Sequence, residues 1–354
     1  MAGVYVHIPF CKRRCLYCDF YSTTLLERRE AYVAALLREI AQRRGELRTP
    51  VRTIYFGGGT PSQLPVADIE RLLAAIGMGD AKEITVEINP GDANLGYLTA
   101  LRRIGVNRLS IGVQSFQDDL LRRLGRRHDG EQAMQAIDWA KEAGFRNISI
   151  DLMYAIPGQT MEHWQADVQT ALLMSVHHIS TYGLIYEPGT VLTRMVESGE
   201  LTAVDEDTEN AMYDYLCERL KRAGYDHYEV SNFALPGHYS RHNWSYWHDL
   251  QYLGIGAAAH SYDGMHRSWN VSDIDQYIRG AERETETLTD EDRYNERVML
   301  GLRTSDGISR DILYDQQAAE QLIRRGLLKE EEGRLIATQQ GLHILNSIIE
   351  TLMI

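Results

Sequence analysis

The sequence predicts an α/β fold, an incomplete parallel (β/α)6 barrel followed by a smaller, winged-helix-like C-terminal domain. Short apolar runs rich in β-branched residues alternate with amphipathic helical segments from residue 4 to residue 184. Polar or glycine residues follow these runs, and the character of the chain changes again near residue 287. The alternation predicts the sheet, the polar residues predict a ligand site at one of its edges, and the later change predicts a second domain.

Six apolar runs indicate buried parallel strands, because both faces of such strands are covered by other elements. Amphipathic periodicity indicates helices between them, and Gly144 follows one helix in the position of a C-cap. Six strand–helix units imply right-handed crossovers in either an open twisted sheet or an incomplete barrel. The expected strands are 4–8, 53–56, 84–88, 109–113, 148–153 and 179–184, and the expected helices are 29–43, 67–76, 132–143 and 161–174.

Three segments are expected along the chain. Residues 1–190 form the partial barrel, residues 191–285 extend it with an aromatic and histidine-rich stretch, and residues 286–354 form the C-terminal domain. Within the last segment, 327–336 indicates a hairpin, and Thr338 can cap a helix that follows it. Helices followed by a hairpin predict the winged-helix-like domain.

Composition narrows the classes of function. The 354 residues are 44% hydrophobic and 25% charged, which is typical of a globular protein, and no apolar run is long enough to span a bilayer. Segment 1–10 lacks the pattern of a secretory signal, so we expect a cytoplasmic protein. The net charge of −13 argues against nucleic acid as a partner, because phosphate binding relies on clustered Lys and Arg.

Three of the four cysteines form a C-x3-C-x2-C loop directly after the first expected strand. Three thiolates can bind three irons of a [4Fe–4S] cluster and leave the fourth iron open, where S-adenosylmethionine (SAM) can chelate it. Zinc is the alternative, with His7 or Asp19 as the fourth ligand that a structural zinc site needs. Cys217 lies in a helical stretch and is interpreted as a small buried apolar side chain. The candidate metal ligands are Cys11, Cys15 and Cys18.

Other unusual residues follow the remaining strands, at the edge where parallel α/β folds bind ligands. The glycine run 57–59 lets a backbone approach a ligand closely, although many strand-to-helix turns contain glycines. Taken singly, each of the polar or charged residues there is explained equally well as a salt-bridged strand end or as a solvated loop residue. Together they suit a zwitterionic sulfonium ligand, since carboxylates pair with its ammonium group and Arg pairs with its carboxylate. These residues are Glu87, Gln114, Arg126 and Asp151.

Five motifs resemble the oxygen-independent coproporphyrinogen oxidase (HemN) branch of radical SAM proteins, over nearly the whole chain. They lie at 5–11, 57–61, 112–115, 124–128 and 151–159. The resemblance implies a radical SAM barrel in which the three loop cysteines hold the cluster. It also implies eleven SAM contacts, with a looser match around the last two. These are Tyr5, Tyr17, Gly58, Gly59, Thr60, Glu87, Gln114, Arg126, Asp151, Gly183 and Ala258.

Two features separate the subfamilies of this branch. The decarboxylating enzymes carry a further cysteine two residues after the third cluster cysteine, where this chain has Phe20. Residues 242–247 are similar to the HNxxYW motif of the HemW heme chaperones, and so is the segment 18–22. An imidazole can bind heme iron and aromatic rings can pack on a porphyrin, but the same residues also suit an ordinary packed seam. The candidate heme residues are His242, Asn243, Tyr246 and Trp247, with His238, His248 and His260 as alternative iron ligands.

The resemblance therefore implies a heme chaperone that binds heme and passes it to respiratory hemoproteins, with the cluster and SAM in support. The alternative is SAM-dependent oxidative decarboxylation of coproporphyrinogen III. A third interpretation, DNA binding by the C-terminal domain, is disfavoured by the acidic run Glu330, Glu331 and Glu332 in the expected hairpin. The resemblance is compatible with a homodimer and with peripheral association with the membrane where the recipients lie.

Overall fold

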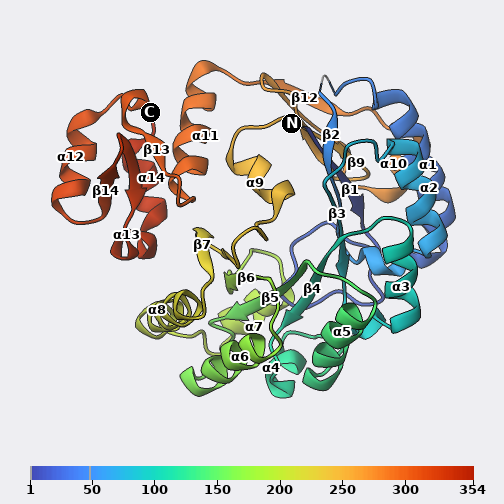
Figure 1. Cartoon of the computed structure of the whole chain (residues 1–354), viewed down its shortest axis with the longest axis horizontal. Coiled ribbons are helices and arrows are strands. Elements are labelled where there is room, and N and C mark those ends of the chain that lie inside the picture. Colours follow the sequence, from blue (N-terminus) through green and yellow to red (C-terminus); the bar gives the residue numbers. More distant parts are fainter. Residues whose placement is uncertain (1, 48) are drawn as a thin grey trace.

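The computed structural model describes residues 2–47 and 49–354 and is built on a twelve-stranded sheet and a separate three-stranded sheet (Figure 1). The order of the large sheet is β12-β11-β10-β9-β1-β2-β3-β4-β5-β6-β8-β7. Its centre consists of six parallel strands that pair in chain order. These are β1 (Ala2–Ile8), β2 (Val51–Gly58), β3 (Glu83–Ile88), β4 (Arg108–Gln114), β5 (Ile148–Tyr154) and β6 (His178–Gly183).

All six predicted strands are present, because their apolar side chains are buried on both faces of the sheet. The crossover helices lie along one side of the curved sheet (Figure 1). Asp129 and Thr160 cap α5 and α6 with capping boxes, and Gly144 adopts a φ of +89° just after α5, as its predicted C-cap position requires. The helices are α1 (Arg29–Arg43), α2 (Val66–Ile76), α3 (Leu95–Arg103), α4 (Asp118–Arg123), α5 (Gly130–Glu142) and α6 (Met161–Leu173), and the short 3-10 helices are η1 (Leu26–Arg28), η2 (Pro61–Gln63), η3 (Pro90–Asp92) and η4 (Arg310–Ile312).

The segment after β6 extends the same sheet at both of its edges. Strand β8 pairs antiparallel with β6, whereas β9 returns across the molecule and pairs in parallel with β1. The added strands are β7 (Asp226–Glu229), β8 (Asn232–Ala234), β9 (Tyr252–Ile255), β10 (His260–Tyr262), β11 (His266–Trp269) and β12 (Glu284–Thr287). The added helices are α7 (Val191–Glu197), α8 (Glu206–Arg222), α9 (Arg241–Trp247) and α10 (Ile274–Arg279). The predicted boundaries at residues 190 and 285 stay a prediction, since the sheet itself runs through the first of them.

The C-terminal part has its own hydrophobic core, built from residues between 294 and 352. The predicted hairpin is formed by β14 and β15, and Thr338 caps the following helix by accepting a hydrogen bond of 3.1 Å from the amide of Gly341. An ion pair of 2.9 Å between Arg303 and the buried Glu229 joins this part to β7. Its elements are α11 (Asp290–Leu302), β13 (Ile308–Ser309), α12 (Gln316–Arg324), β14 (Leu328–Glu331), β15 (Arg334–Ala337), α13 (Gln339–His343) and α14 (Leu345–Leu352).

None of the helices in the described residues combines the length and the apolar character needed to cross a membrane. Cys217 lies on α8, as predicted, and is half-buried against the main core. Burial raises the pKa of its thiol to about 11, so the side chain is neutral near pH 7. Its position is consistent with the interpretation as a packing residue.

Candidate cluster and cofactor site

The cysteine loop begins where β1 ends. The amide of Cys11 donates a hydrogen bond of 2.8 Å to the carbonyl of Thr23, and the amide of Leu16 donates one of 3.0 Å to the carbonyl of Leu124. These bonds hold the loop against two other segments of the barrel. Cys11 is buried, whereas Cys15 and Cys18 are half-buried. The thiol of Cys11 lies 3.2 Å from the Thr60 hydroxyl, so the loop faces the turn that follows β2.

The protonation of the thiols tests whether the loop fits an iron–sulfur cluster. Burial raises the pKa of Cys11, and burial raises the pKa of Cys18 to about 11. Such thiols stay protonated near pH 7 unless a cation stabilises the thiolates. A bound iron cluster supplies that positive charge, so the donor set fits it.

The zinc alternative lacks its fourth ligand. Both ring nitrogens of His7 are engaged, at 3.0 Å from the Tyr5 hydroxyl and at 2.9 Å from the carbonyl of Tyr21. Asp19 is exposed. Within residues 2–47 and 49–354, no group of three His, Cys, Asp or Glu side chains is placed to hold a single metal ion.

The glycine turn after β2 packs directly against the end of β1. Gly58 has a φ of +112°, and a Cβ atom there would lie 2.4 Å from the ring of His7. A Cβ atom on Gly59 would lie 2.6 Å from the backbone of Pro9. Because neither position tolerates a side chain, glycine is required for the turn to meet the cysteine loop.

Two half-buried carboxylates lie on neighbouring parts of the sheet, Glu87 on β3 and Asp151 on β5. Glu87 accepts hydrogen bonds of 2.8 Å from the Tyr55 hydroxyl and 3.1 Å from the amide of Gly58, and Asp151 accepts one of 3.3 Å from the Ser110 hydroxyl. Burial raises the pKa of Glu87 to about 7 and that of Asp151 to about 6. A cationic ligand would favour their ionised forms, which fits the ammonium and sulfonium groups of SAM.

Arg126 connects β4 with the cysteine loop. Its guanidinium donates to the carbonyl of Gly112 and lies 3.5 Å from the thiol of Cys15. Its Nε atom is buried and has no hydrogen-bond partner among the described residues. A buried donor without a partner is costly, and a ligand carboxylate would satisfy it. Gln114 is also buried and adopts a φ of +68°, at a bulge between β4 and β5.

The remaining predicted SAM residues lie around this centre. Burial raises the pKa of the Tyr17 phenol, which the nearby Arg126 partly offsets. Gly183 ends β6, where a Cβ atom would lie 2.7 Å from the carboxylate of Glu209. Tyr5 and Ala258 also line a neighbouring cavity. The contacts of these residues with SAM stay a prediction.

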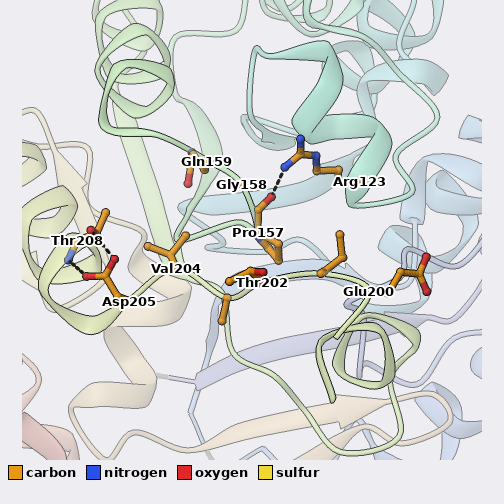
Figure 2. A pocket seen from close by; sticks show the side chains of 11 residues that line it. Arg123, Pro157, Gly158, Gln159, Glu200, Thr202, Val204, Asp205 and Thr208 are labelled. Atoms are coloured by element: carbon orange, nitrogen blue, oxygen red, sulfur yellow. Dashed lines mark hydrogen bonds between the residues drawn. The ribbon is translucent and has the colours of Figure 1, made fainter. Parts of the chain in front are cut away.

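That neighbouring cavity has a volume of 740 Å³ and lies between the cysteine loop, α9, the strands β9 to β11, and α11. Phe20, which stands where the decarboxylating enzymes carry their further cysteine, lines it and is 70% exposed. Tyr246 and His260 also line it. Figure 2 shows a second cavity, of 570 Å³, in which Arg123 donates to the carbonyl of Pro157 at 2.7 Å. None of the predicted site residues lines this second cavity.

The histidine of the HNxxYW motif is 1% exposed. His242 Nδ1 lies 2.8 Å from the Thr53 hydroxyl, and His242 Nε2 lies 2.8 Å from the Tyr246 hydroxyl. The His242 ring stacks on Tyr55 at 5.1 Å, and burial lowers its pKa to about 3. Both ring nitrogens are therefore engaged, and a role as iron ligand would require these hydrogen bonds to break.

The rest of the motif packs between the sheet and the C-terminal part. The Arg303 guanidinium lies 5.1 Å from the centre of the Trp247 ring. Asn243 is half-buried, and its backbone amide donates a hydrogen bond of 3.4 Å to the hydroxyl of Ser240, which caps α9. These contacts correspond to the packed seam that was the alternative interpretation of the motif, and heme contacts by Asn243 and Trp247 stay a prediction.

Two features of the site were missed from the sequence. Arg108 is 1% exposed on β4, and its Nε and Nη1 atoms have no partner in the part of the chain that the structure describes. An arginine inside an apolar strand was the available signal. Arg267 also lines the 740 Å³ cavity, but nothing local marks it, because β9 to β11 bring it there.

Known protein families match both parts of the chain. Residues 5–171 match the radical SAM superfamily, and residues 288–344 match the HemN C-terminal domain. The structure is similar to that of coproporphyrinogen III oxidase (HemN) from Escherichia coli, described as a radical SAM enzyme, with a TM-score of 0.84 and 25% identity over 99% of this chain and 90% of that one. These likenesses confirm the predicted fold class.

Two relatives match over nearly their full length. Heme chaperone HemW from Lactococcus lactis is 38% identical, covering 99% of this chain and 97% of the relative. Heme chaperone HemW from Bacillus subtilis is 36% identical, covering 96% of each chain. They confirm the resemblance on which the prediction from the motifs was based.

Proposed function

Because the chain belongs to the HemW family of radical SAM proteins, we propose that it binds heme and delivers it to hemoproteins. The observation that carries this proposal is the full-length similarity to proteins named heme chaperones. Phe20 supports it, since it supplies no thiol where the decarboxylating enzymes have one. The recipients we propose are respiratory hemoproteins, reached by peripheral association with a membrane, and the oligomeric state we propose is a homodimer.

Family membership implies a [4Fe–4S] cluster and SAM, which together supply one-electron chemistry when bound. The three loop cysteines would hold the cluster, and the Thr60 hydroxyl would donate a hydrogen bond to the buried sulfur of Cys11. Arg126 would orient a ligand carboxylate through its unpartnered Nε atom. Glu87 and Asp151 would hold the positively charged groups of SAM once they are ionised.

The competing function is oxidative decarboxylation of coproporphyrinogen III, and the similarity of the fold to that of HemN supports it as the alternative. One experiment separates the two. The anaerobically reconstituted protein is titrated with heme and, in parallel, incubated with coproporphyrinogen III, SAM and a reductant. We expect one heme per chain and no protoporphyrinogen.

The Phe20→Cys variant is the matched companion, because it introduces a thiol at the position where the decarboxylating enzymes carry their further cysteine. Multiple-turnover formation of protoporphyrinogen by the unaltered protein would overturn the chaperone proposal. Absence of heme binding by protein with full cluster content would also overturn it.

A further inference from the structure

We propose that heme binds in the 740 Å³ cavity beside the cysteine loop, with His260, and not His242, as the ligand of its iron. This inference rests on the proposed function and specifies its site. The volume lies within the range of small-molecule pockets, which are lined mainly by apolar and aromatic side chains with a few polar groups. An iron porphyrin needs three things from such a cavity: flat surface, an iron ligand and cations for its propionates.

Aromatic side chains supply the flat surface. Tyr246 and Tyr252 line the cavity with their rings edge to face at 4.6 Å, and Tyr262 lies 6.3 Å from Tyr252. Phe20 adds an apolar ring that is 70% exposed. Burial of such exposed aromatic surface against a porphyrin face is favourable.

Hydrogen bonding excludes three of the other histidines, His7, His242 and His248. His7 lines the cavity, but both of its ring nitrogens are engaged, as are those of His242. His248 is held at 2.9 Å from the carbonyl of Trp244 and at 3.0 Å from the Asp306 carboxylate. His238 is not among the residues that line the cavity. A histidine that already uses both nitrogens has no lone pair free for iron.

His260 is the histidine that meets the requirement. It lies on β10, lines the cavity and is exposed. Its ring stacks on Trp269 at 5.8 Å, and neither ring nitrogen has a hydrogen bond to any residue that the structure describes. Partial burial and the nearby Arg267 lower its pKa, which favours the neutral imidazole that binds iron.

Arg14 supplies the cation. It belongs to the cysteine loop, lines the cavity and is exposed, and its guanidinium makes no ion pair or hydrogen bond with the rest of the described chain. Arg267 is less available, because it pairs with Glu296 at 2.7 Å. A free guanidinium pairs readily with a carboxylate, so we assign a heme propionate to Arg14.

The same geometry gives His242 a different role. Its hydrogen bond of 2.8 Å fixes the Tyr246 hydroxyl, and Tyr246 forms part of the cavity wall. His242 is therefore a positioning residue that acts through Tyr246. Its loss would loosen the wall and leave the iron ligand in place.

The test is a heme titration of the anaerobically reconstituted full chain and of four variants, followed by absorption and electron paramagnetic resonance spectra. We expect His260→Ala to weaken heme binding about tenfold or more and to lose the spectrum of histidine ligation, with added imidazole restoring it. His242→Ala and Arg14→Ala should bind heme less tightly with an unchanged ligation spectrum. His238→Ala, the matched histidine outside the cavity, should resemble the unaltered protein.

The outcomes separate this inference from the function on which it rests. If the unaltered protein binds no heme, the proposed function fails. If it binds heme and His260→Ala keeps both the affinity and the ligation spectrum, the proposed function survives and the assignment of His260 is wrong. The same conclusion follows if His242→Ala or His238→Ala is the one variant that loses the ligation spectrum. Circular dichroism and the iron and sulfide content identify any variant that is misfolded. If His260→Ala is misfolded, His260→Gln takes its place, and the measurement is whether added imidazole restores the spectrum of histidine ligation.

Discussion

A buried ion pair between Glu39 and Arg43 holds residues 254–256, which lead to the wall of the 740 Å³ cavity, against α1. Glu39 of α1 accepts a hydrogen bond of 2.6 Å from Arg43. It also accepts three others, which come from the backbone amide of Gly256 at 2.9 Å, the side-chain amide of Asn270 at 2.8 Å and the hydroxyl of Tyr277 at 2.6 Å. Arg43 in turn donates a hydrogen bond of 2.8 Å to the carbonyl of Gly254 on β9.

We predict that Glu39→Gln lowers the free energy of unfolding by about 3 kcal/mol, since breaking one partner of a buried pair costs about 3–5 kcal/mol. The lower end applies because Arg43 keeps a second partner in Glu46 at 3.1 Å. The assay is urea unfolding monitored by circular dichroism. The free energies of unfolding of the two proteins are compared with the same slope of free energy against urea concentration. Because Gly254 and Gly256 lie between α1 and His260, the variant should also bind heme more weakly.

Glu46→Gln is the matched control, because its side chain is 44% exposed and also pairs with Arg43. A pair with one solvent-exposed carboxylate contributes less than a fully buried pair, so this change should have a smaller effect than Glu39→Gln. If both variants lose the same small amount of unfolding free energy, the buried network does not stabilise the cavity wall and the reasoning is wrong.

Three further predictions concern the cofactors and the residues that would hold them. Replacement of Cys11, Cys15 or Cys18 by Ala should abolish the cluster, whereas Cys217→Ala should keep it. Chemical analysis should find about four iron and four sulfide per chain in the unaltered protein. Stoichiometric zinc without sulfide in anaerobically purified protein would contradict this prediction. SAM affinity, measured by calorimetry, should rise as pH increases from about 6 to 8, because SAM favours the ionised form of Glu87 and burial raises the pKa of Glu87 to about 7. The rise should be no more than about tenfold per pH unit, since one proton is released. The same raised pKa means that the folded SAM-free protein binds this proton more tightly than the unfolded chain, so its stability should fall as pH rises from about 4.5 through about 7. A SAM affinity that does not change over this pH range, or that falls, would show that Glu87 does not hold a cationic group of SAM.

The sequence by itself determined the features that depend on neighbouring positions. The six parallel strands follow from short apolar runs, and Gly144 and Thr338 follow from the local demands of helix ends. The cysteine loop follows from ligand spacing within eight residues, and the polar residues after the strands follow from the rule that parallel strands end at one edge. The predicted centre of the SAM site depends on the same rule.

The tertiary structure decided which distant segments meet. Arg126 lies against Cys15 although the two are 111 positions apart, and β9 pairs with β1 and so carries His260 to the cavity beside the cysteine loop. A short strand has no local feature that selects its partner, because hydrogen bonding along any sheet edge is alike and the choice depends on packing of the whole chain. The burial of His242 is of the same kind. Its motif indicates a histidine among aromatic rings, but only the placement of Thr53 and Tyr246 around the ring uses both nitrogens and leaves the exposed imidazole of His260 free for iron.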